Sequence, residues 1–449
     1  MTSAPADERH PEKFPAFSLL VCVVAILAAL ALAYAPIREK LDRIEYWTAD
    51  WRTVLLADRT PAQHDRIVVV VFDPATFDGS TVSPIPRDTH AQVLRTVDAM
   101  QPKAIGLDFF FVASQGSEKD GAMLDALHQI KTPIVLGAID KHTGDFSERQ
   151  MAYQEKFLAE AGRPAGYLAL KYDRGHIVRR TDPPLADSPF KESFARQVAL
   201  AAGAPLKGPG TSSSAMRIAW LVGPNHDTEP FFKVSAKDLL PGSDEARRNE
   251  LERRIKGNVV LTGIEMPNSD WHDTALSVWT GEKMLGVMIH AHILAQLLDG
   301  RYFTELAGRE RWMWLTAVGG IGLVLGWSLR GKRAAFLNFS VATAILVAID
   351  AACYSGLRIV LPFALTLSVW FIGVMLGQHL RVLAWWVTAR PRDTAPKAPS
   401  PGDRSGSGST PRRGTQRTRA LASGAGCCGR GEPRRAPRIR LRVRRSPCR

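Results

Sequence analysis

Four apolar segments interrupt an otherwise mixed chain, over residues 17–35, 312–329, 334–357 and 359–380. A helix needs about 20 mainly apolar residues to cross a bilayer. Each segment therefore predicts a transmembrane helix, the first over 17–36. For that first segment a cleaved signal peptide is the competing interpretation, because small residues near its end weakly match a cleavage site.

The loop between the second and third apolar segments predicts the orientation. It consists of Arg330-Gly331-Lys332-Arg333, and cytoplasmic loops are enriched in Lys and Arg. Counting crossings from this turn places the N-terminal residues 1–16 and the chain after the fourth segment in the cytoplasm. Residues 37–311 then lie outside it.

Two details of these segments bear on their packing. Gly322-x-x-x-Gly326 and Gly373-x-x-x-Gly377 predict close helix contacts, although glycine is also simply common in membrane helices. Asp350 is an acid within the third segment. We expect it at the outer end, close to Arg358, as an interfacial side chain rather than as part of an ion pathway.

Residues 37–311 show the patterns of a folded α/β domain. Apolar residues recur every three or four positions over 38–60, which predicts an amphipathic helix leading out of the membrane. Continuous apolar strands alternate with helical patterns: strands at 67–72, 103–111 and 133–138, helices at 88–100 and 118–130. Strands buried on both faces are typical of parallel sheets. The order therefore predicts a mainly parallel sheet covered by helices.

The rest of this region continues the same alternation. A glycine-containing turn at Asp173-Arg174-Gly175 predicts a hairpin. Asp88 and Gly300 are expected to cap helices at their N- and C-terminal ends. The further elements that we expect are strands at 166–172, 176–179, 216–222 and 258–264 and helices at 190–202 and 286–298.

Charge is distributed unevenly along the chain. The net charge is +14, and residues 391–449 hold 16 Lys and Arg against 3 Asp and Glu. This Arg-, Pro-, Gly- and Ser-rich tail predicts a disordered cytoplasmic segment that contacts anionic lipid or nucleic acid. Because nearly all of its basic residues are Arg, an out-of-frame translation of GC-rich DNA is an equally open interpretation. The tail would then replace a frameshifted or truncated output region.

The cysteines lie at 22, 353, 427, 428 and 448, so residues 37–311 contain none. No disulfide supports this region, and its length is sufficient for a hydrophobic core. No Cys/His spacing typical of zinc sites occurs. The chain also lacks a nucleophile elbow, a P-loop and an HExxH motif. We therefore predict no catalytic residue, no metal and no cofactor.

Polar side chains at the predicted strand ends form a candidate ligand site. Asp73 follows the strand 67–72 and Asp108 ends the next one. In α/β sheets ligands favour the crevice beyond the carboxyl ends of strands, and Arg87 and His90 would complete a polar group. Arg87 is the strongest candidate because a guanidinium can bind a carboxylate or phosphate with two hydrogen bonds. The structural alternative is that each Asp caps a turn and Arg87 pairs with one of them.

Asp270 is a further candidate ligand contact, beside His272 and Asp273. These residue types bind metals, and an ordinary polar loop explains them equally well. His290 and His292 point to different sides of the predicted helix and cannot bind one metal together. We expect His290 to be buried and hydrogen-bonded.

Several short motifs follow one another in a recognisable order. A strand ending in Asp73 precedes Pro86-Arg87 and His90-Ala91, and Gly106-Leu107-Asp108 marks the next strand. The remaining motifs are Asp173-Arg174-Gly175 with Arg179-Arg180, the strand 255–264, Asp270 with Thr274, and Gly286 to Ala291. Together they resemble the type-2 CHASE sensory domain, an extracytoplasmic input module of bacterial receptors, over nearly all of residues 40–310. Ser83-Pro84-Ile85-Pro86 stands where this family often has tryptophans.

The resemblance implies a transmembrane sensor in the bacterial cell membrane that detects a periplasmic ligand or protein. Family members often carry a cyclase or kinase output domain, and residues 391–449 contain none. The chain would then be a receptor that lacks its output, or one that passes the signal to a separate cytoplasmic output protein. The family also implies a homodimer. A membrane-tethered interaction module and an outward-facing hydrolase are the alternative functions.

Overall fold

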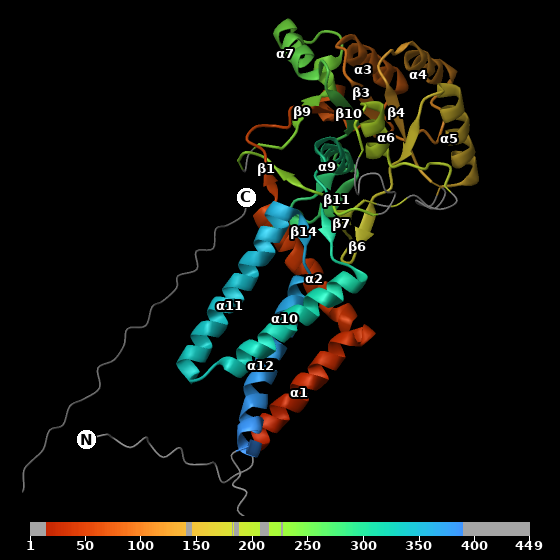
Figure 1. Ribbon diagram of the computed structural model, residues 1–449. Helices are drawn as coiled ribbons and strands as arrows, with labels where there is room; N and C mark the ends of the chain where they lie inside the picture. The colour runs from red at the N-terminus through yellow and green to blue at the C-terminus, as the bar shows by residue number, and fades with distance from the viewer. Residues whose placement is uncertain are drawn as a thin grey trace, which may run out of the picture. The chain divides into compact units, whose positions relative to one another are not determined.

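The computed structural model describes residues 15–140, 146–181, 183, 188–206, 215–225 and 228–388. The predictions for the N-terminal residues 1–14 and for the tail 391–449 lie outside these described residues. Figure 1 shows an α/β part built around one large sheet, together with a group of long helices.

The large sheet has six strands in the order β5-β4-β3-β10-β2-β9, and every neighbouring pair is parallel. Strand β10 comes late in the chain yet lies at the centre, between β3 and β2. The strands are β2 (Ile67–Phe72), β3 (Ala104–Leu107), β4 (Ile134–Ala138), β5 (Ala165–Tyr167), β9 (Phe232–Ser235) and β10 (Val259–Ile264).

Helices cover both faces of this sheet because its strands are apolar on both sides. In β2, Ile67, Val69 and Val71 belong to one core, and Val68 and Phe72 belong to the other. The first core is closed by α6 (Phe194–Ala201) and α9 (Gly286–Asp299). The second is closed by α3 (Arg87–Ala99), α4 (Ser117–Gln129), α5 (Glu148–Ala161) and α7 (Glu245–Ile255). The predicted α/β class with a parallel sheet is confirmed.

A smaller sheet of four strands lies in the order β12-β11-β7-β6. It contains the predicted hairpin, β6 (Lys171–Asp173) paired antiparallel with β7 (Ile177–Arg180), and joins it to β11 (Trp271–Thr274) and β12 (Met284–Leu285). Two-residue strands make two further pairs: β1 (Asp58–Arg59) with β8 (Leu221–Val222), and β13 (Thr304–Glu305) with β14 (Ile359–Val360). Short helical turns occur at η1 (Pro74–Phe77), η3 (Ala236–Leu239) and α8 (Ser277–Thr280).

Several predicted elements need correction. The strand expected over 166–172 is divided between β5 and β6, because the two halves pair with different sheets. The strand expected over 216–222 is reduced to β8, whose partner is only two residues long. Asp88 does not cap α3, because Pro86 holds that position and Asp88 lies in the first turn. Gly300 does end α9, in the left-handed conformation expected of a cap.

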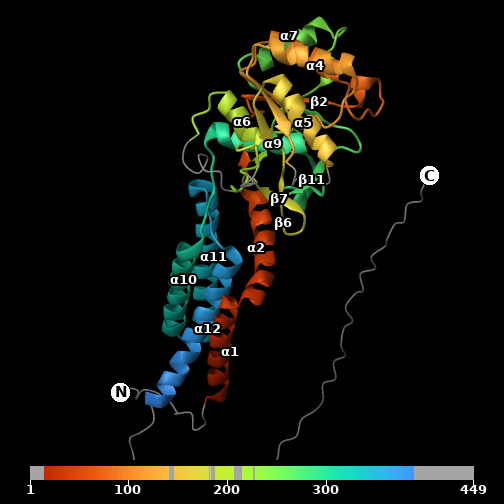
Figure 2. The same cartoon turned by 90° about the vertical axis from the view of Figure 1, so that its right-hand side faces the viewer.

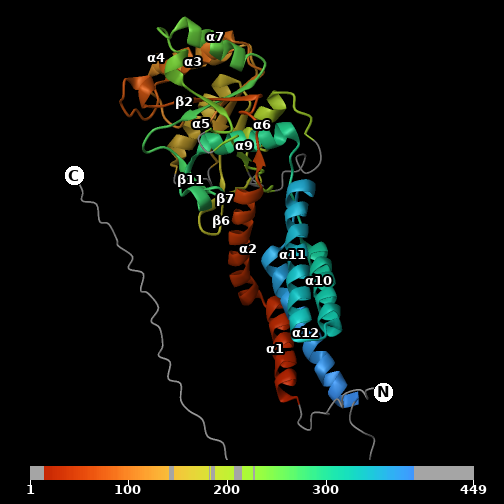
Figure 3. The same cartoon turned by 90° about the vertical axis from the view of Figure 1, so that its left-hand side faces the viewer.

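The long helices are α1 (Ala16–Ala33), α2 (Ala35–Leu56), α10 (Gly308–Ser328), α11 (Lys332–Ala352) and α12 (Phe363–Thr388), with a π-turn, η4 (Cys353–Leu357), ending α11. Figures 2 and 3 show α1, α10, α11 and α12 running alongside one another. By length and composition, two helical stretches can cross a membrane, Ala335–Leu357 and Phe363–Thr388. Ala16–Leu32 is apolar but shorter. Among the described residues α10, which begins with the charged run Arg309-Glu310-Arg311, does not meet the same measure.

The two glycine pairs bring α10 and α12 into close contact, as predicted. A Cβ atom at Gly326 would lie 2.1 Å from the carbonyl oxygen of Val374, and one at Gly377 would lie 2.1 Å from that of Leu323. No larger residue fits at either position without separating the helices. Small residues at such contacts are what lets helix backbones approach each other in lipid.

Candidate functional site

Asp73 lies where β2 ends and caps the turn that follows. Its Oδ1 atom accepts hydrogen bonds from the Thr76 amide at 3.0 Å and from the Ser235 hydroxyl at 2.7 Å. These bonds connect the ends of β2 and β9. Asp73 therefore caps a turn, which was the structural alternative to ligand binding. The partners of its carboxylate named here are all protein groups.

Arg87 is buried at the start of α3, and its guanidinium is surrounded by the protein. Its Nη1 atom donates to the Asp120 carboxylate at 2.5 Å and to the Tyr153 hydroxyl at 2.7 Å, and Nη2 donates to the Ala113 carbonyl at 2.7 Å. The guanidinium also stacks on the ring of Phe157 at 4.7 Å. Arg87 pairs with Asp120, not with Asp73 or Asp108.

His90 lies one turn further along α3 in an aromatic cluster. Its ring centroid is 4.4 Å from that of Phe109 and 4.6 Å from that of Phe72. Burial, together with the nearby positive charge of Arg87, lowers the pKa of His90 to about 3. The imidazole is therefore neutral at physiological pH, and in the present conformation it serves as a packing element.

Asp108 and Asp270 come together with two histidines that the sequence had treated separately. Asp108, at the carboxyl end of β3, lies 4.0 Å from Nε2 of His290 on α9. Asp270 lies 2.8 Å from Nε2 of His272 on β11. The other ring nitrogen of His272 lies 2.6 Å from the Tyr172 hydroxyl of β6. The five residues form a polar cluster where the two sheets meet.

Burial strongly perturbs the titration of this cluster. Burial, with the Asp270 carboxylate nearby, raises the pKa of Asp108 to about 8. Burial lowers the pKa of His290 to about 4, with Asp270 opposing and His272 reinforcing the change. Near neutral pH Asp108 is therefore protonated and His290 is neutral. The cluster can donate and accept hydrogen bonds, and a bound charge would change its protonation.

The motif Gly286 to Ala291 begins directly against this polar cluster. The Gly286 amide donates to the Asp270 carbonyl at 3.0 Å, and a Cβ atom at Gly286 would lie 2.8 Å from the Asp270 carboxylate. Glycine therefore lets α9 begin close to this carboxylate, which a larger residue would displace. Within the described residues, no group of three His, Cys, Asp or Glu side chains is placed to hold a metal ion.

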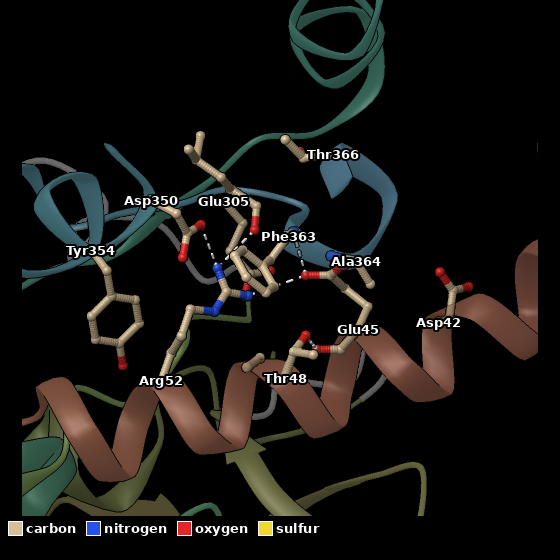
Figure 4. A network of polar contacts seen from close by, with 12 residues as sticks. Asp42, Glu45, Thr48, Arg52, Glu305, Asp350, Tyr354, Phe363, Ala364 and Thr366 are labelled. Atoms are coloured by element: carbon tan, nitrogen blue, oxygen red, sulfur yellow. Dashed lines mark hydrogen bonds and ion pairs between the residues drawn. The ribbon is translucent and has the colours of Figure 1, made fainter. Parts of the chain in front are cut away.

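A second polar site joins α2 to the apolar helices, and Figure 4 shows it from close by. Arg52 of α2 is buried, and its Nη1 atom donates to Asp350 of α11 and to the Leu361 carbonyl, both at 2.9 Å. Its Nη2 atom donates to Glu45 at 3.1 Å. Glu45 in turn accepts the amides of Phe363 and Ala364, each at 2.8 Å. A carboxylate at this position caps α12 and complements its dipole.

The same helix is bound to the α/β domain by a buried ion pair. Arg179 of β7 donates from Nε and Nη2 to the two oxygens of Asp50, at 2.7 and 2.6 Å, and both side chains are almost fully buried. Beside it, Arg180 binds Asp173 at 2.6 Å and Glu305 at 2.8 Å. The Arg-Arg pair of the hairpin motif thus connects the small sheet to α2 and to β13.

A polar cavity of about 200 Å³ lies next to these contacts. It is lined by charged side chains of both signs, among them Glu45, Arg52, Arg180, Arg217 and Glu305. Although burial opposes ionisation, Arg217 and Arg180 hold the pKa of Glu305 below its usual range. Glu305 is therefore charged at neutral pH and shared between two arginines.

The charged partner of Asp350 was not foreseen. Asp350 lies near the end of α11 as expected, but it pairs with Arg52, whereas Arg358 pairs with Asp58 at 2.8 Å. Asp350 is buried among protein groups. The sequence also singled out neither Glu45 nor Asp50 nor Arg52. Glu45 and Arg52 are seven residues apart and share one side of α2, whereas Asp50 points to another side, so no single stripe of charges marked the three residues.

A comparison with known families decides the classification of this fold. A model of the CHASE2 domain family matches residues 21–331, which is well over half of the chain. The chain belongs to the CHASE2 family. CHASE2 domains are extracytoplasmic sensory domains rather than catalytic ones. No curated protein and no solved structure shows a significant match to the chain.

The CHASE2 match extends beyond the α/β domain at both ends. It includes most of α1 and all of α10. The family match therefore covers the sensory domain, α2 and the Asp50–Arg179 pair, whereas the α2 partners Asp350, Phe363 and Ala364 lie beyond it. The two apolar stretches, 335–357 and 363–388, fit the association of this CHASE2 protein with a membrane.

Proposed function

We propose that this protein is a bacterial transmembrane sensor whose CHASE2 domain, residues 37–311, faces the periplasm. In this arrangement α1, α10, α11 and α12 all cross the cell membrane, and the N-terminus and the chain after α12 lie in the cytoplasm. The family membership supports the sensory role, and the apolar stretches of α11 and α12 support the membrane location. The basic turn at 330–333 supports the orientation.

One observation carries the proposal: α2 is tied to the sensory domain and to the apolar helices by buried charges. Asp50 holds the β6–β7 hairpin through Arg179, and Arg52 and Glu45 hold α11 and α12. The α2 residues that make these two sets of contacts, 45–52, lie within about two turns of the same helix. A displacement of the hairpin would therefore move the residues that fix the apolar helices.

Buried ion pairs suit such a role because they depend strongly on geometry. Separating one leaves an uncompensated charge, so intermediate positions cost much more than either well-paired arrangement. A signal can shift the balance between two arrangements only by binding them unequally. We propose Asp108 and Asp270 as polar contacts of such a signal. Asp73, Arg87 and His90 would hold the surrounding strands and helices in place.

The compartment is tested by reporter fusions after Gln150. An export-dependent phosphatase should be active there, and a cytosol-dependent galactosidase should be inactive. A fusion at Gly331, in the basic turn, provides the matched control and should show the opposite pattern. High galactosidase activity after Gln150 would contradict the sensor proposal.

The coupling is tested by hydrogen exchange of the full chain in lipid nanodiscs. Asp50→Asn, on the domain side of α2, should speed exchange of the Phe363 and Ala364 amides, which are bonded to Glu45. Arg247→Gln is the control, since Arg247 pairs with Asp238 on α7 and η3. If Asp50→Asn and Arg247→Gln leave these two amides equally protected, α2 does not couple the sensory domain to the apolar helices.

A membrane-tethered interaction module is the second candidate, favoured by the outer face of α2. Ile44, Trp47 and Leu55 are 51%, 57% and 70% exposed, while Asp50 and Arg52 are buried. The second half of this helix therefore buries two charges and exposes apolar side chains. A photoreactive residue at Trp47 that captured the same protein with and without periplasmic solutes would favour this function over sensing.

A further inference from the structure

A second cavity, of about 630 Å³, lies on the side of the α/β domain that faces the end of α2. Its volume falls within the range of ligand pockets, about 300–1,000 Å³. The lining includes Val54 and Leu55 of α2, Leu221 and Val222 of β8, and Trp279 of α8. These side chains make much of its wall apolar.

One buried polar group in this lining lacks a partner. His292 of α9 is fully buried, and its Nδ1 atom accepts a hydrogen bond from the Leu221 amide at 3.2 Å. In the neutral ring Nε2 then carries the proton, and among the described residues Nε2 has no hydrogen-bond partner. A buried donor left unsatisfied is destabilising. Nε2 is covered by its neighbours in this conformation, so an acceptor in the cavity would pair with it after a small shift of those side chains.

The imidazole is held firmly in this orientation. Its ring meets those of Phe231 and Trp220 edge to face, with centroids 4.9 and 5.1 Å apart. The charged residues of the lining, Arg59, Glu229 and Glu282, are exposed at its mouth and have both signs. The neutral polar residues Asn225, Thr228 and Thr280 also line the cavity. Away from the mouth the lining is therefore uncharged, with apolar and neutral polar groups, which favours an uncharged ligand.

We propose that this cavity binds a small, uncharged, largely apolar molecule whose carbonyl oxygen accepts a hydrogen bond from Nε2 of His292. Leu55 and Trp279, which are 70% and 61% exposed, would be covered by the ligand and would add to its affinity. Since Val54 and Leu55 directly follow Arg52 and Thr53, the ligand would contact the helix that holds α11. Its role as the signal rests on the proposed sensor function.

The experiment uses the full chain in lipid nanodiscs and a matched pair of photoaffinity probes. One probe is a nine-carbon methyl ketone with a diazirine in its chain, and the other is the same molecule without the carbonyl. The ketone should label peptides around 221–225 and 276–284 in a saturable manner. Its half-saturation concentration should be about tenfold lower than that of the alkane, from the added hydrogen bond.

Two variants test the cavity and its hydrogen-bond donor separately. Thr280→Trp adds bulk inside the lining and should abolish labelling, whereas Lys283→Trp, an exposed neighbour outside the lining, should not. His292→Phe should remove the tenfold advantage of the ketone without changing the alkane. Should His292→Phe fail to fold, the probe pair and Thr280→Trp decide the question alone.

The proposal is overturned if labelling is confined to lipid-facing residues of α10 to α12, or if Thr280→Trp leaves it unchanged. Equal half-saturation of the two probes would exclude the contact with His292. None of these results depends on the compartment or on the coupling through α2. The reporter fusions and hydrogen exchange therefore test the sensor function separately.

Discussion

Strand β10 and helix α2 both hold central positions in this molecule, but they bury different kinds of side chain. In β10, Val259, Val260 and Leu261 are almost fully buried between two apolar cores. In α2 the buried residues include Asp50 and Arg52, while Trp47 and Leu55 are exposed. Apolar packing has no preferred direction and tolerates small shifts. An ion pair holds only in a narrow geometry, so the two regions should respond differently to change.

The largest effect should come from removing one partner of the buried pair between Asp50 and Arg179. Arg179→Met leaves the Asp50 carboxylate uncompensated and should lower the free energy of unfolding by about 3–5 kcal/mol. The double variant Asp50→Leu/Arg179→Met should recover most of this loss. Urea unfolding of the full chain in nanodiscs, followed by tryptophan fluorescence, measures both. A double variant as unstable as the single one would show that the pair itself, rather than its charge balance, stabilises the junction.

The apolar core should show the opposite behaviour. Leu261→Ala in β10 removes a fully buried side chain and should cost about 2–5 kcal/mol, depending on how far the cavity collapses. No charged or polar substitution nearby should restore stability. The same urea titration applies, with Leu200→Ala, on the exposed side of α6, as the control. A loss below about 1 kcal/mol would mean that the central strand contributes less than its burial indicates.

The polar cluster around Asp108 should make stability depend on pH. Because the pKa of Asp108 is raised to about 8, the folded state keeps a proton that the unfolded state releases above pH 4. The free energy of unfolding therefore falls as pH rises towards 8. The buried histidines, whose pKa values are lowered to about 3 or 4, act in the opposite sense only below about pH 6.5.

The window from pH 6.5 to 8 therefore isolates Asp108. There stability should fall by up to about 1.4 kcal/mol per pH unit, and Asp108→Asn should remove that slope. Asp125→Asn, on the exposed side of α4, serves as the control and should keep the slope. Parallel pH profiles for wild type and Asp108→Asn would contradict the raised pKa.

The smallest effect should come from an exposed ion pair. Arg247 binds Asp238 at 2.9 Å, with both side chains about one third exposed. Solvent screens such a pair, so Arg247→Ala should cost less than about 1 kcal/mol. High salt should reduce even this value. A loss as large as that of Arg179→Met would show that burial does not distinguish the two ionic contacts.

The sequence alone determined the α/β class and the parallel character of the sheet, and it marked α10 and α12 as helices that can make close contacts. These features follow from local patterns: apolar strands such as 67–72, helical spacing, and glycines four residues apart. It also indicated that Asp73 could cap its turn, because the carboxylate and Thr76 are neighbours in the chain. The capping box at Ser147 and Gln150 would have revealed α5 in the same way.

Only the tertiary structure decided which charges meet. Arg52 and Asp350 are 298 residues apart, and Asp50 and Arg179 are 129 apart. No periodicity links such positions, and a buried charge looks like a surface charge in a sequence. The insertion of β10 between β2 and β3, and the meeting of Asp108 with His290, depend likewise on how distant segments pack. The chain specifies its elements locally, and long-range packing places the charges that connect the sensory domain to the apolar helices.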